Sequence, residues 1–409
     1  MTSADTSRLD RPQRHIELSR TAATAAVAVL IGVLFAGSTA VTPLYIMYKQ
    51  AFGFSQITLT LIYAVYVVGN LGGLLLLGRL SDQVGRRPVA AASIALAIIS
   101  ALVFLFARGV GALYLGRILS GLAISIGVGT GTAWLAELID DESKSRATVI
   151  ATSANFIGLG VSALIAGLLA EYLPWPLHLT YIVYLLALFA AATAVLMAPE
   201  TVTRSRPSLP LSIRPRVSVP PQIRAQFVAP AVTGFGSLAL VGFYAALAPS
   251  LLADQLHVTN HAVAGAIFLE MAVFVAGAIV ATRSLSSRAS MLLALALMPP
   301  SVALIVAAQL AASMALLIIA TAVCAVTAGL GYRGSLQVTN QIAPPNQRAE
   351  TVSSYLICGF AGNALPVIGI GVISTLAGAN AASLAFAATI IVFAVIALYF
   401  GMRQPPKGE

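Results

Sequence analysis

The sequence predicts an all-α integral membrane protein whose twelve transmembrane helices form two pseudo-symmetric six-helix bundles. Three observations lead to this prediction: the composition, the number of long apolar segments, and the internal repeat that relates the two halves of the chain. Of the 409 residues, 59% are hydrophobic and 9% are charged, whereas soluble proteins carry about 25% charged residues. So few charges cannot cover a water-exposed surface, and we therefore expect lipid to surround most of the molecule.

Twelve apolar segments are long enough to cross a bilayer, which takes about 20 residues. The first six cover residues 22–44, 57–77, 89–107, 112–136, 147–170 and 178–198. The second six cover residues 228–252, 262–282, 290–309, 313–337, 350–377 and 382–402. The expected organisation is a tail at 1–21, a bundle at 22–198, a linker at 199–227, a bundle at 228–402 and a tail at 403–409. Five arginines and six prolines in the linker are typical of an unpacked connection.

Basic residues are distributed unevenly between alternate loops. Nineteen of the 23 lysines and arginines fall in the two tails, the linker and every second loop, while only Lys49 and Arg108 fall in the loops on the other side. An excess of Lys and Arg marks the cytoplasmic loops of membrane proteins. We therefore expect both termini in the cytoplasm and the chain in the inner (plasma) membrane.

The second half of the chain repeats features of the first at a constant offset. With an offset of 202 residues, Gly127 matches Gly329 and Arg146-Ala147 matches Arg348-Ala349. Two repeated helical bundles with a cavity between them are the architecture of many secondary transporters.

Several functional classes lack their motifs in this sequence. Lys49, Lys144 and Lys407 follow Tyr, Ser and Pro, so no glycine-lysine phosphate loop is present, and zincin and nucleophile-elbow patterns are missing too. We therefore predict that the protein is not an enzyme and that it holds no cofactor and no metal ion. His257 and His261 are expected to be hydrated side chains of an outer loop. The basic residues flank apolar runs, which argues against a nucleic-acid partner.

The loop after the second segment carries a motif. It reads Gly78-Arg79-Leu80-Ser81-Asp82-Gln83-Val84-Gly85-Arg86-Arg87-Pro88. This loop resembles the G-x-L-x-D-x-x-G-R-[RK] signature of the major facilitator superfamily, and together with the twelve-segment plan the resemblance covers nearly the whole chain. It implies a secondary transporter that works by alternating access, closest to efflux-type members. The resemblance also implies a conformational latch made of Gly78, Asp82, Gly85, Arg86 and Arg87.

The fourth segment contains a charge. The stretch Arg117–Gly121 is similar to the family's R-x-x-x-G segment, and the resemblance implies that Arg117 takes part in proton coupling. A charge within a span is usually functional, although a structural pair or an Arg that reaches the membrane surface is the alternative. The glycines of the fifth segment partly resemble the antiporter pattern, but Ala163 stands where a proline is expected.

Glu270 is the strongest single candidate for a residue that carries a proton. It lies near the middle of the eighth segment between apolar neighbours, and a carboxyl held there can bind and release a proton near physiological pH. The alternative is a permanent ion pair or a neutral, hydrogen-bonded acid. Arg333 could pair with Glu270, bind an anionic substrate, or extend to the membrane surface.

Polar residues within spans tend to face the bundle interior, because amides in hydrocarbon need partners. The candidates for the substrate cavity are Tyr45, Tyr63, Tyr66, Asn70, Asn155, Arg333 and Asn363. For each of them, a role in holding helices together agrees with the sequence as well as contact with the substrate does.

These observations favour a proton-coupled exporter of a small drug-like or amphiphilic compound, acting as a functional monomer in the lipid bilayer. Proton-coupled uptake of an organic anion, with Arg333 as its ligand, is the alternative within the same class. A non-transporting receptor or sensor on the same fold is the alternative from another class, although the longest soluble segment is only the linker.

Overall fold

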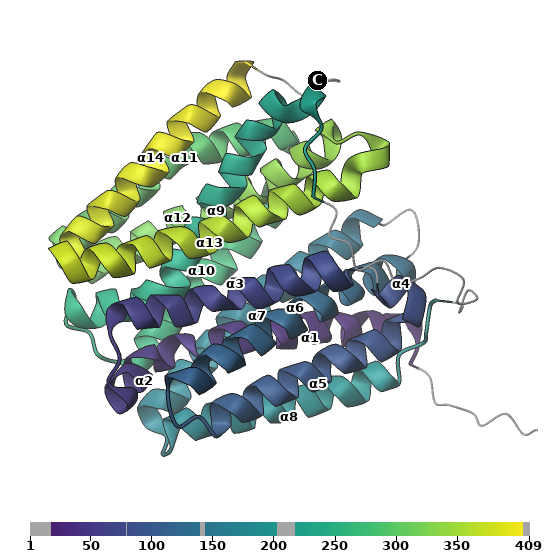
Figure 1. Ribbon diagram of the computed structural model, residues 1–409, viewed down its shortest axis with the longest axis horizontal. Helices are drawn as coiled ribbons and strands as arrows, with labels where there is room; N and C mark the ends of the chain where they lie inside the picture. Colours follow the sequence, from purple (N-terminus) through teal and green to yellow (C-terminus); the bar gives the residue numbers. More distant parts are fainter. Residues whose placement is uncertain (1–17, 79, 140–143, 203–216, 404–409) are drawn as a thin grey trace, which may run out of the picture.

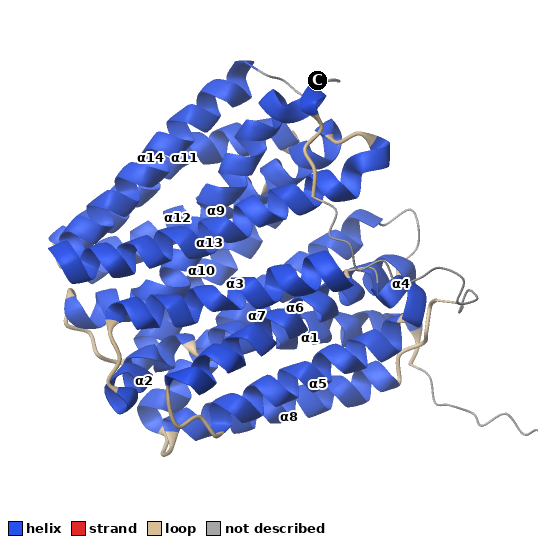
Figure 2. Ribbon diagram, viewed as in Figure 1, coloured by secondary structure: helices blue, strands red, loops and turns tan. Residues whose placement is uncertain are grey.

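The computed structural model describes residues 18–78, 80–139, 144–202 and 217–403, and its regular elements there are all helical (Figure 2). Twelve helical segments are long and apolar enough to cross a membrane. The predicted all-α membrane fold with twelve spans is therefore confirmed. Most of both predicted tails and the middle of the predicted linker lie outside the described residues.

The first half of the chain supplies six membrane-crossing segments. Its elements are α1 (Arg20–Thr39), η1 (Thr42–Leu44), α2 (Tyr45–Phe52), α3 (Gln56–Leu77), α4 (Leu80–Val84), α5 (Arg86–Leu105), α6 (Val110–Leu138), α7 (Lys144–Tyr172) and α8 (Pro176–Leu196). The first expected segment, 22–44, is interrupted: α1 ends at Thr39, and a short 3-10 turn that begins at Thr42 and contains Pro43 leads into α2. A proline has no N–H to donate and its ring clashes with the preceding turn, which ends a regular helix.

The second half repeats this plan. Its elements are η3 (Pro221–Ile223), α9 (Arg224–Asp254), α10 (His261–Ala281), α11 (Ser287–Leu310), α12 (Met314–Ile342), η4 (Pro345–Gln347), α13 (Arg348–Ala377) and α14 (Ala379–Arg403). In Figure 1, α1–α8 form one group of helices and α9–α14 form another. We call these groups the N-terminal bundle and the C-terminal bundle.

The most extensive contacts between the bundles are those of α7 with α10 and of α3 with α13. Small residues allow the backbones to approach closely at these contacts. A Cβ added to Gly265 of α10 would lie 2.4 Å from the Ala163 oxygen of α7, and one added to Gly371 of α13 would lie 2.3 Å from the Thr60 hydroxyl of α3.

The bundles lie close together at the end of the molecule that carries α2 and diverge toward the end that carries α4 (Figure 1). We call these the α2 end and the α4 end. At the α2 end, Glu171 of α7 accepts a hydrogen bond from the His261 backbone N–H at 2.9 Å and lies 3.0 Å from the His261 ring. Gln56 of α3 also reaches the Ser250 hydroxyl of α9 at 3.5 Å. The structure is therefore closed at its α2 end.

Candidate functional site

A cavity of about 110 Å³ lies between the bundles. Helices α1, α3, α6 and α7 line it from one side and α9, α10, α12 and α13 from the other. Its lining consists of Phe35, Ser38, Thr39, Tyr63, Tyr66, Arg117, Asn155, Phe156, Leu159, Leu238, Val241, Ala245, Phe268, Tyr332, Leu356, Phe360 and Asn363. Aromatic and aliphatic side chains dominate, with one charge and a few amides and hydroxyls.

Arg117 is the only charged residue that lines this cavity, and it is 1% exposed. Its guanidinium donates to the Ser38 carbonyl at 2.7 Å and to the Tyr63 carbonyl at 3.4 Å. It also lies over the rings of Tyr66 and Tyr63, at 4.9 and 5.5 Å from the ring centroids. Carbonyl oxygens and aromatic faces stabilise a buried cation only in part. Because no carboxylate of the described residues pairs with Arg117, the cavity carries a net positive charge.

Hydrogen bonds connect several polar residues around the cavity. The Tyr63 hydroxyl of α3 donates to the Asn363 side-chain oxygen of α13 at 2.8 Å, which joins the two bundles. Asn70 donates to the Tyr66 hydroxyl at 3.2 Å from behind the lining and does not itself line the cavity. The Asn155 side-chain oxygen is buried without a hydrogen-bond partner. A buried acceptor without a partner is unfavourable, so Asn155 is ready to accept a hydrogen bond from a bound molecule or water.

Arg333 lies away from the cavity, which corrects its predicted place in the lining. Its guanidinium donates to the carbonyls of Thr282, Arg283 and Leu285 at 2.7, 3.0 and 3.3 Å. These carbonyls follow the last turn of α10, where helix geometry leaves carbonyl groups without partners inside the helix. Arg333 therefore holds the connection between α10 and α11 at the α4 end. The neighbouring residue Tyr332 lines the cavity instead.

Two further predicted residues lie near the cavity without lining it. Tyr45 begins α2, is 1% exposed, and has a hydroxyl with no hydrogen-bond partner. Glu270 is partly buried on α10 and does not line the cavity. Arg333 and Glu270 form no ion pair with each other in the described structure.

The motif loop is organised around Arg86. The Arg86 guanidinium contacts Asp82, Glu137 and the Ser81 hydroxyl, each at 2.6 Å. Glu200 accepts hydrogen bonds from the first backbone N–H groups of α5, where an anion is favoured.

The other predicted latch residues surround this centre. Gly85 has a φ of 113°, which a side chain rarely allows. The Arg87 guanidinium donates to the Ala198 carbonyl, and Gly78 ends α3. These contacts lie within the N-terminal bundle and between it and the residues that directly follow α8, Ala198 and Glu200. The Asp82 side chain is 58% exposed.

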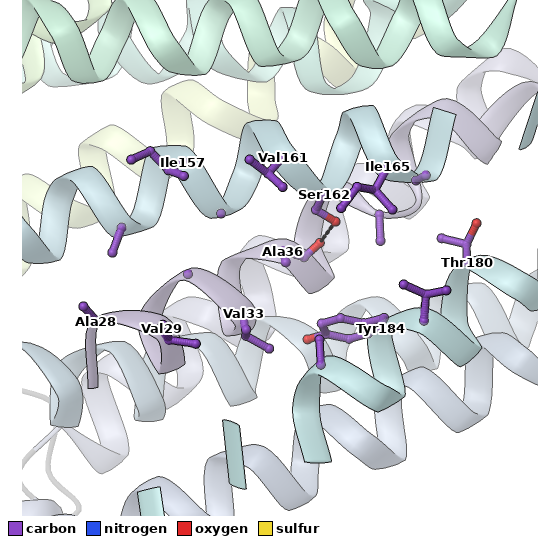
Figure 3. Close-up of a pocket in the computed structure, with 17 residues that line it drawn as sticks. Ala28, Val29, Val33, Ala36, Ile157, Val161, Ser162, Ile165, Thr180 and Tyr184 are labelled. Carbon is purple, nitrogen blue, oxygen red and sulfur yellow. Dashed lines mark hydrogen bonds between the residues drawn. The ribbon is translucent and has the colours of Figure 1, made fainter. Parts of the chain in front are cut away.

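A groove of about 410 Å³ lies between α1, α7 and α8 (Figure 3). Its lining is almost wholly apolar, and Ser162 directs its hydroxyl to the Ala36 carbonyl at 2.8 Å (Figure 3). Helices α1 and α7 also line the central cavity through Phe35, Ser38 and Asn155. These two helices therefore separate the groove from the cavity.

Ser38, Thr39 and Tyr332 line the cavity without having been predicted to do so. Hydroxyl residues are common in membrane helices, because they can bond to their own backbone, so the sequence contains no signal that marks these three. Their place in the cavity follows from the rotation of α1 and α12 within the bundles.

The family described as the Major Facilitator Superfamily matches residues 27–298 of this chain. The inner membrane transport protein YnfM of Escherichia coli is 31% identical over 180 residues, 43% of this chain and 41% of the relative. The multidrug transporter MdfA of Shigella boydii is 29% identical over 187 residues, 44% of each chain. An MFS-type transporter of Penicillium rubens is 30% identical over 152 residues, 37% of this chain and 28% of the relative. The matched segments thus span less than half the length of these curated relatives.

Solved structures show the same fold. A bacterial homologue of the human lysosomal transporter Spinster, described as inward-facing and unoccupied, matches with a TM-score of 0.71 at 14% identity, covering 94% of this chain and 96% of that one. The human organic anion transporter MFSD10 matches with a TM-score of 0.66 at 16% identity, covering 94% of this chain and 100% of that one.

Proposed function

This chain belongs to the Major Facilitator Superfamily of membrane transporters, and we propose that it exports a small drug-like or amphiphilic molecule in exchange for protons. The observation that carries this proposal is the central cavity, to which both bundles contribute helices and whose lining is mostly aromatic and aliphatic. The chemical character of this lining suits an amphiphilic molecule, and the cavity of about 110 Å³ must widen to admit one, because small-molecule pockets usually measure about 300–1,000 Å³. The partial likeness to a multidrug transporter supports the same cargo class.

We also propose the orientation and working state of the molecule. The excess of basic residues at the α4 end favours a cytoplasmic position for that end in the inner membrane. With the α2 end closed by the Glu171–His261 contact, the structure then corresponds to a cytoplasm-facing state of a functional monomer. Alternating access requires that the α2 end opens while the α4 end closes. The exposed Asp82 and its neighbours in the motif loop are positioned to hold the closed α4 end.

Glu270 is the proposed proton carrier. It is a partly buried carboxyl within a membrane-crossing helix, and none of the ion pairs between described residues includes it. A carboxyl in this setting can alternate between its neutral and charged forms as the bundles move. Arg117, which lines the cavity, would influence that equilibrium through its positive charge.

The test uses the full chain in proteoliposomes with and without a pH gradient, and a panel of one cationic, one neutral and one anionic amphiphile. We expect the pH gradient to drive transport of at least one compound, and Glu270→Gln to abolish that gradient-driven component while leaving the melting temperature unchanged. Glu350→Gln, the same change in the first turn of α13, is the control and should retain transport. An unaltered pH dependence in Glu270→Gln would remove Glu270 as the carrier.

Organic-anion transport is the second candidate function. It is favoured by the positive charge of Arg117, which has no carboxylate partner in the described structure and lines the cavity. Under this proposal Arg117, in place of Arg333, would bind the anionic group of the cargo.

A further inference from the structure

A second cavity between the bundles lies at the α2 end, with a volume of about 440 Å³. We call it the vestibule. It shares no lining residue with the central cavity. Lys49, Ser55 and Gln56 line it from the N-terminal bundle, and the C-terminal ends of α9, α11 and α13 together with α14 line it from the other side. Its volume falls within the range of about 300–1,000 Å³ that is usual for small-molecule pockets.

The vestibule wall formed by the C-terminal bundle favours a cation. Asp254 is the last residue of α9, is exposed, and forms no ion pair with another described residue. Gln309 and Ser374 lie near the C-terminal ends of α11 and α13. The C-terminus of a helix carries about half a negative charge. The N-terminus of α14, at Ala379, offsets only part of this negative potential.

The opposite wall favours an anion. Lys49 lies in the last turn of α2, and its ammonium donates to the Gln56 side-chain oxygen at 3.0 Å without a carboxylate partner among the described residues. Ser55 and Gln56 form the N-terminus of α3, where about half a positive charge is located. The two walls meet at the Gln56–Ser250 contact of 3.5 Å.

Gln309 provides an independent sign that the vestibule accommodates a ligand. Its side chain is 6% exposed, and its amide nitrogen donates to Asn380 at 3.2 Å. Its side-chain oxygen is buried and has no hydrogen-bond partner. Buried polar atoms are nearly always hydrogen-bonded in folded proteins, so this oxygen is an acceptor that lacks its donor.

We propose that the vestibule binds a small zwitterion of α-amino-acid size. Its ammonium group would lie toward Asp254 and the Gln309 oxygen, and its carboxylate toward Lys49. A molecule in this position contacts both bundles, so its binding stabilises the conformation that is closed at the α2 end. The vestibule thus acts as a regulatory site that is distinct from the cavity proposed for transport.

The binding test uses the full chain in nanodiscs, with glycine, L-serine and L-glutamine as zwitterionic probes. L-serine methyl ester, which lacks the carboxylate, and N-acetyl-L-serine, which lacks the ammonium, test each half of the recognition separately. We expect at least one zwitterion to bind and to raise the melting temperature, and both blocked derivatives to bind more weakly by about tenfold or more.

Substitutions in the vestibule locate the site. Lys49→Met and Asp254→Asn should each weaken zwitterion binding by about tenfold. Arg108→Gln, which removes an exposed charge at the same end outside the vestibule lining, is the control and should leave binding unchanged. Arg117→Gln, in the central cavity, should also leave it unchanged.

Three results would overturn the proposal: no zwitterion binds up to about 10 mM, the blocked derivatives bind equally well, or binding survives both vestibule substitutions. Failure of the proposed transport function would appear separately, as absent pH-driven transport in a protein that still binds the zwitterion.

Discussion

Arg117 is the residue on which the character of the central cavity depends. It is almost fully buried, and its nearest polar partners are two backbone carbonyls. One guanidinium nitrogen, Nε, is buried without a hydrogen-bond partner. Its positive charge is therefore available to an anionic group that enters the cavity, since carbonyl dipoles compensate a buried charge less fully than a carboxylate does.

If organic anions are the cargo, Arg117→Gln should raise the KM for the anionic amphiphile by about tenfold or more, because a charge-assisted hydrogen bond is lost. The KM for the neutral amphiphile should change little. Initial rates in proteoliposomes measure both constants. Arg333→Gln is the matched control, because that arginine binds carbonyls at the α4 end. An equal rise in KM for both compounds would show that Arg117 supports the cavity without binding the anion.

For single residues, the sequence predicts which polar residues lie within the spans better than it predicts which way their side chains point. The need of polar groups within spans for partners predicts Tyr63, Tyr66, Asn155 and Asn363 as lining residues, and all four line one cavity. Arg333 was a candidate for the same reason but lies at a helix end, among carbonyls. The rotation of α12 decides between these places, and that rotation depends on packing against neighbouring helices, which a single sequence does not reveal.

At the scale of elements, the contact between α1 and α7 sets the wall that separates the groove from the central cavity. A Cβ added to Gly158 of α7 would lie 2.2 Å from the Gly32 carbonyl oxygen of α1. This obstacle is backbone, so the two helices would have to move apart. Ser162 of α7 donates to the Ala36 carbonyl on the same interface, and a shift of the helices would disturb this hydrogen bond too.

Gly158→Ala should therefore destabilise the protein by about 1–3 kcal/mol, the usual cost of inserting a methyl group into a packed interface. The melting temperature of the purified protein in detergent measures the change. Gly129→Ala on α6 is the control, because a Cβ there meets no atom within 4 Å. Equal melting temperatures for the two variants would mean that α1 and α7 separate without cost.

The helices themselves were largely predictable, since a span of about 20 apolar residues has few alternatives in a membrane. Their ends were less so. Helix α6 continues to Leu138 and α9 begins at Arg224, each beyond its expected apolar segment. Polar residues can extend a helix beyond the hydrocarbon region, and hydropathy does not register them.

At the scale of the whole molecule, the closed α2 end depends on few polar contacts. Glu171 accepts a hydrogen bond from the backbone at the start of α10 and contacts the His261 ring. An anion is favoured at this position, since a helix N-terminus carries a partial positive charge. The repeat in the sequence predicts two bundles, but no sequence pattern predicts which end is closed, because hydropathy is the same in every state of the transporter.

Glu171→Gln should shift the equilibrium toward opening of the α2 end, because the amide keeps an acceptor oxygen but loses the charge. A loss of about 0.3–1 kcal/mol, the usual range for a solvent-exposed charge at a helix end, corresponds to a shift of about 2–5-fold. A cysteine introduced at Ser250 reports opening through its rate of reaction with a membrane-impermeant thiol reagent. Glu350→Gln, in the first turn of α13, should leave that rate unchanged. A rate unaffected by Glu171→Gln would remove this contact from the closure.

Alternating access requires that the walls of the vestibule separate in each transport cycle. The side chains of Gln56 and Ser250 approach within 3.5 Å from opposite bundles, so Gln56→Cys with Ser250→Cys places two thiols across this interface. A short cleavable crosslinker should then abolish transport in proteoliposomes, and reduction should restore it. The single variants control for reaction at the native Cys324 and Cys358.

Ser250→Cys with Ser383→Cys is the matched pair, because both positions line the vestibule from the C-terminal bundle alone. A crosslink there should leave transport largely intact if each bundle moves as a unit. Transport that persists with Gln56 and Ser250 joined would mean that cargo crosses without separation of the α2 end. The moving part would then be a smaller group of helices within one bundle, and the Gly32–Gly158 contact between α1 and α7 would be the place to seek it.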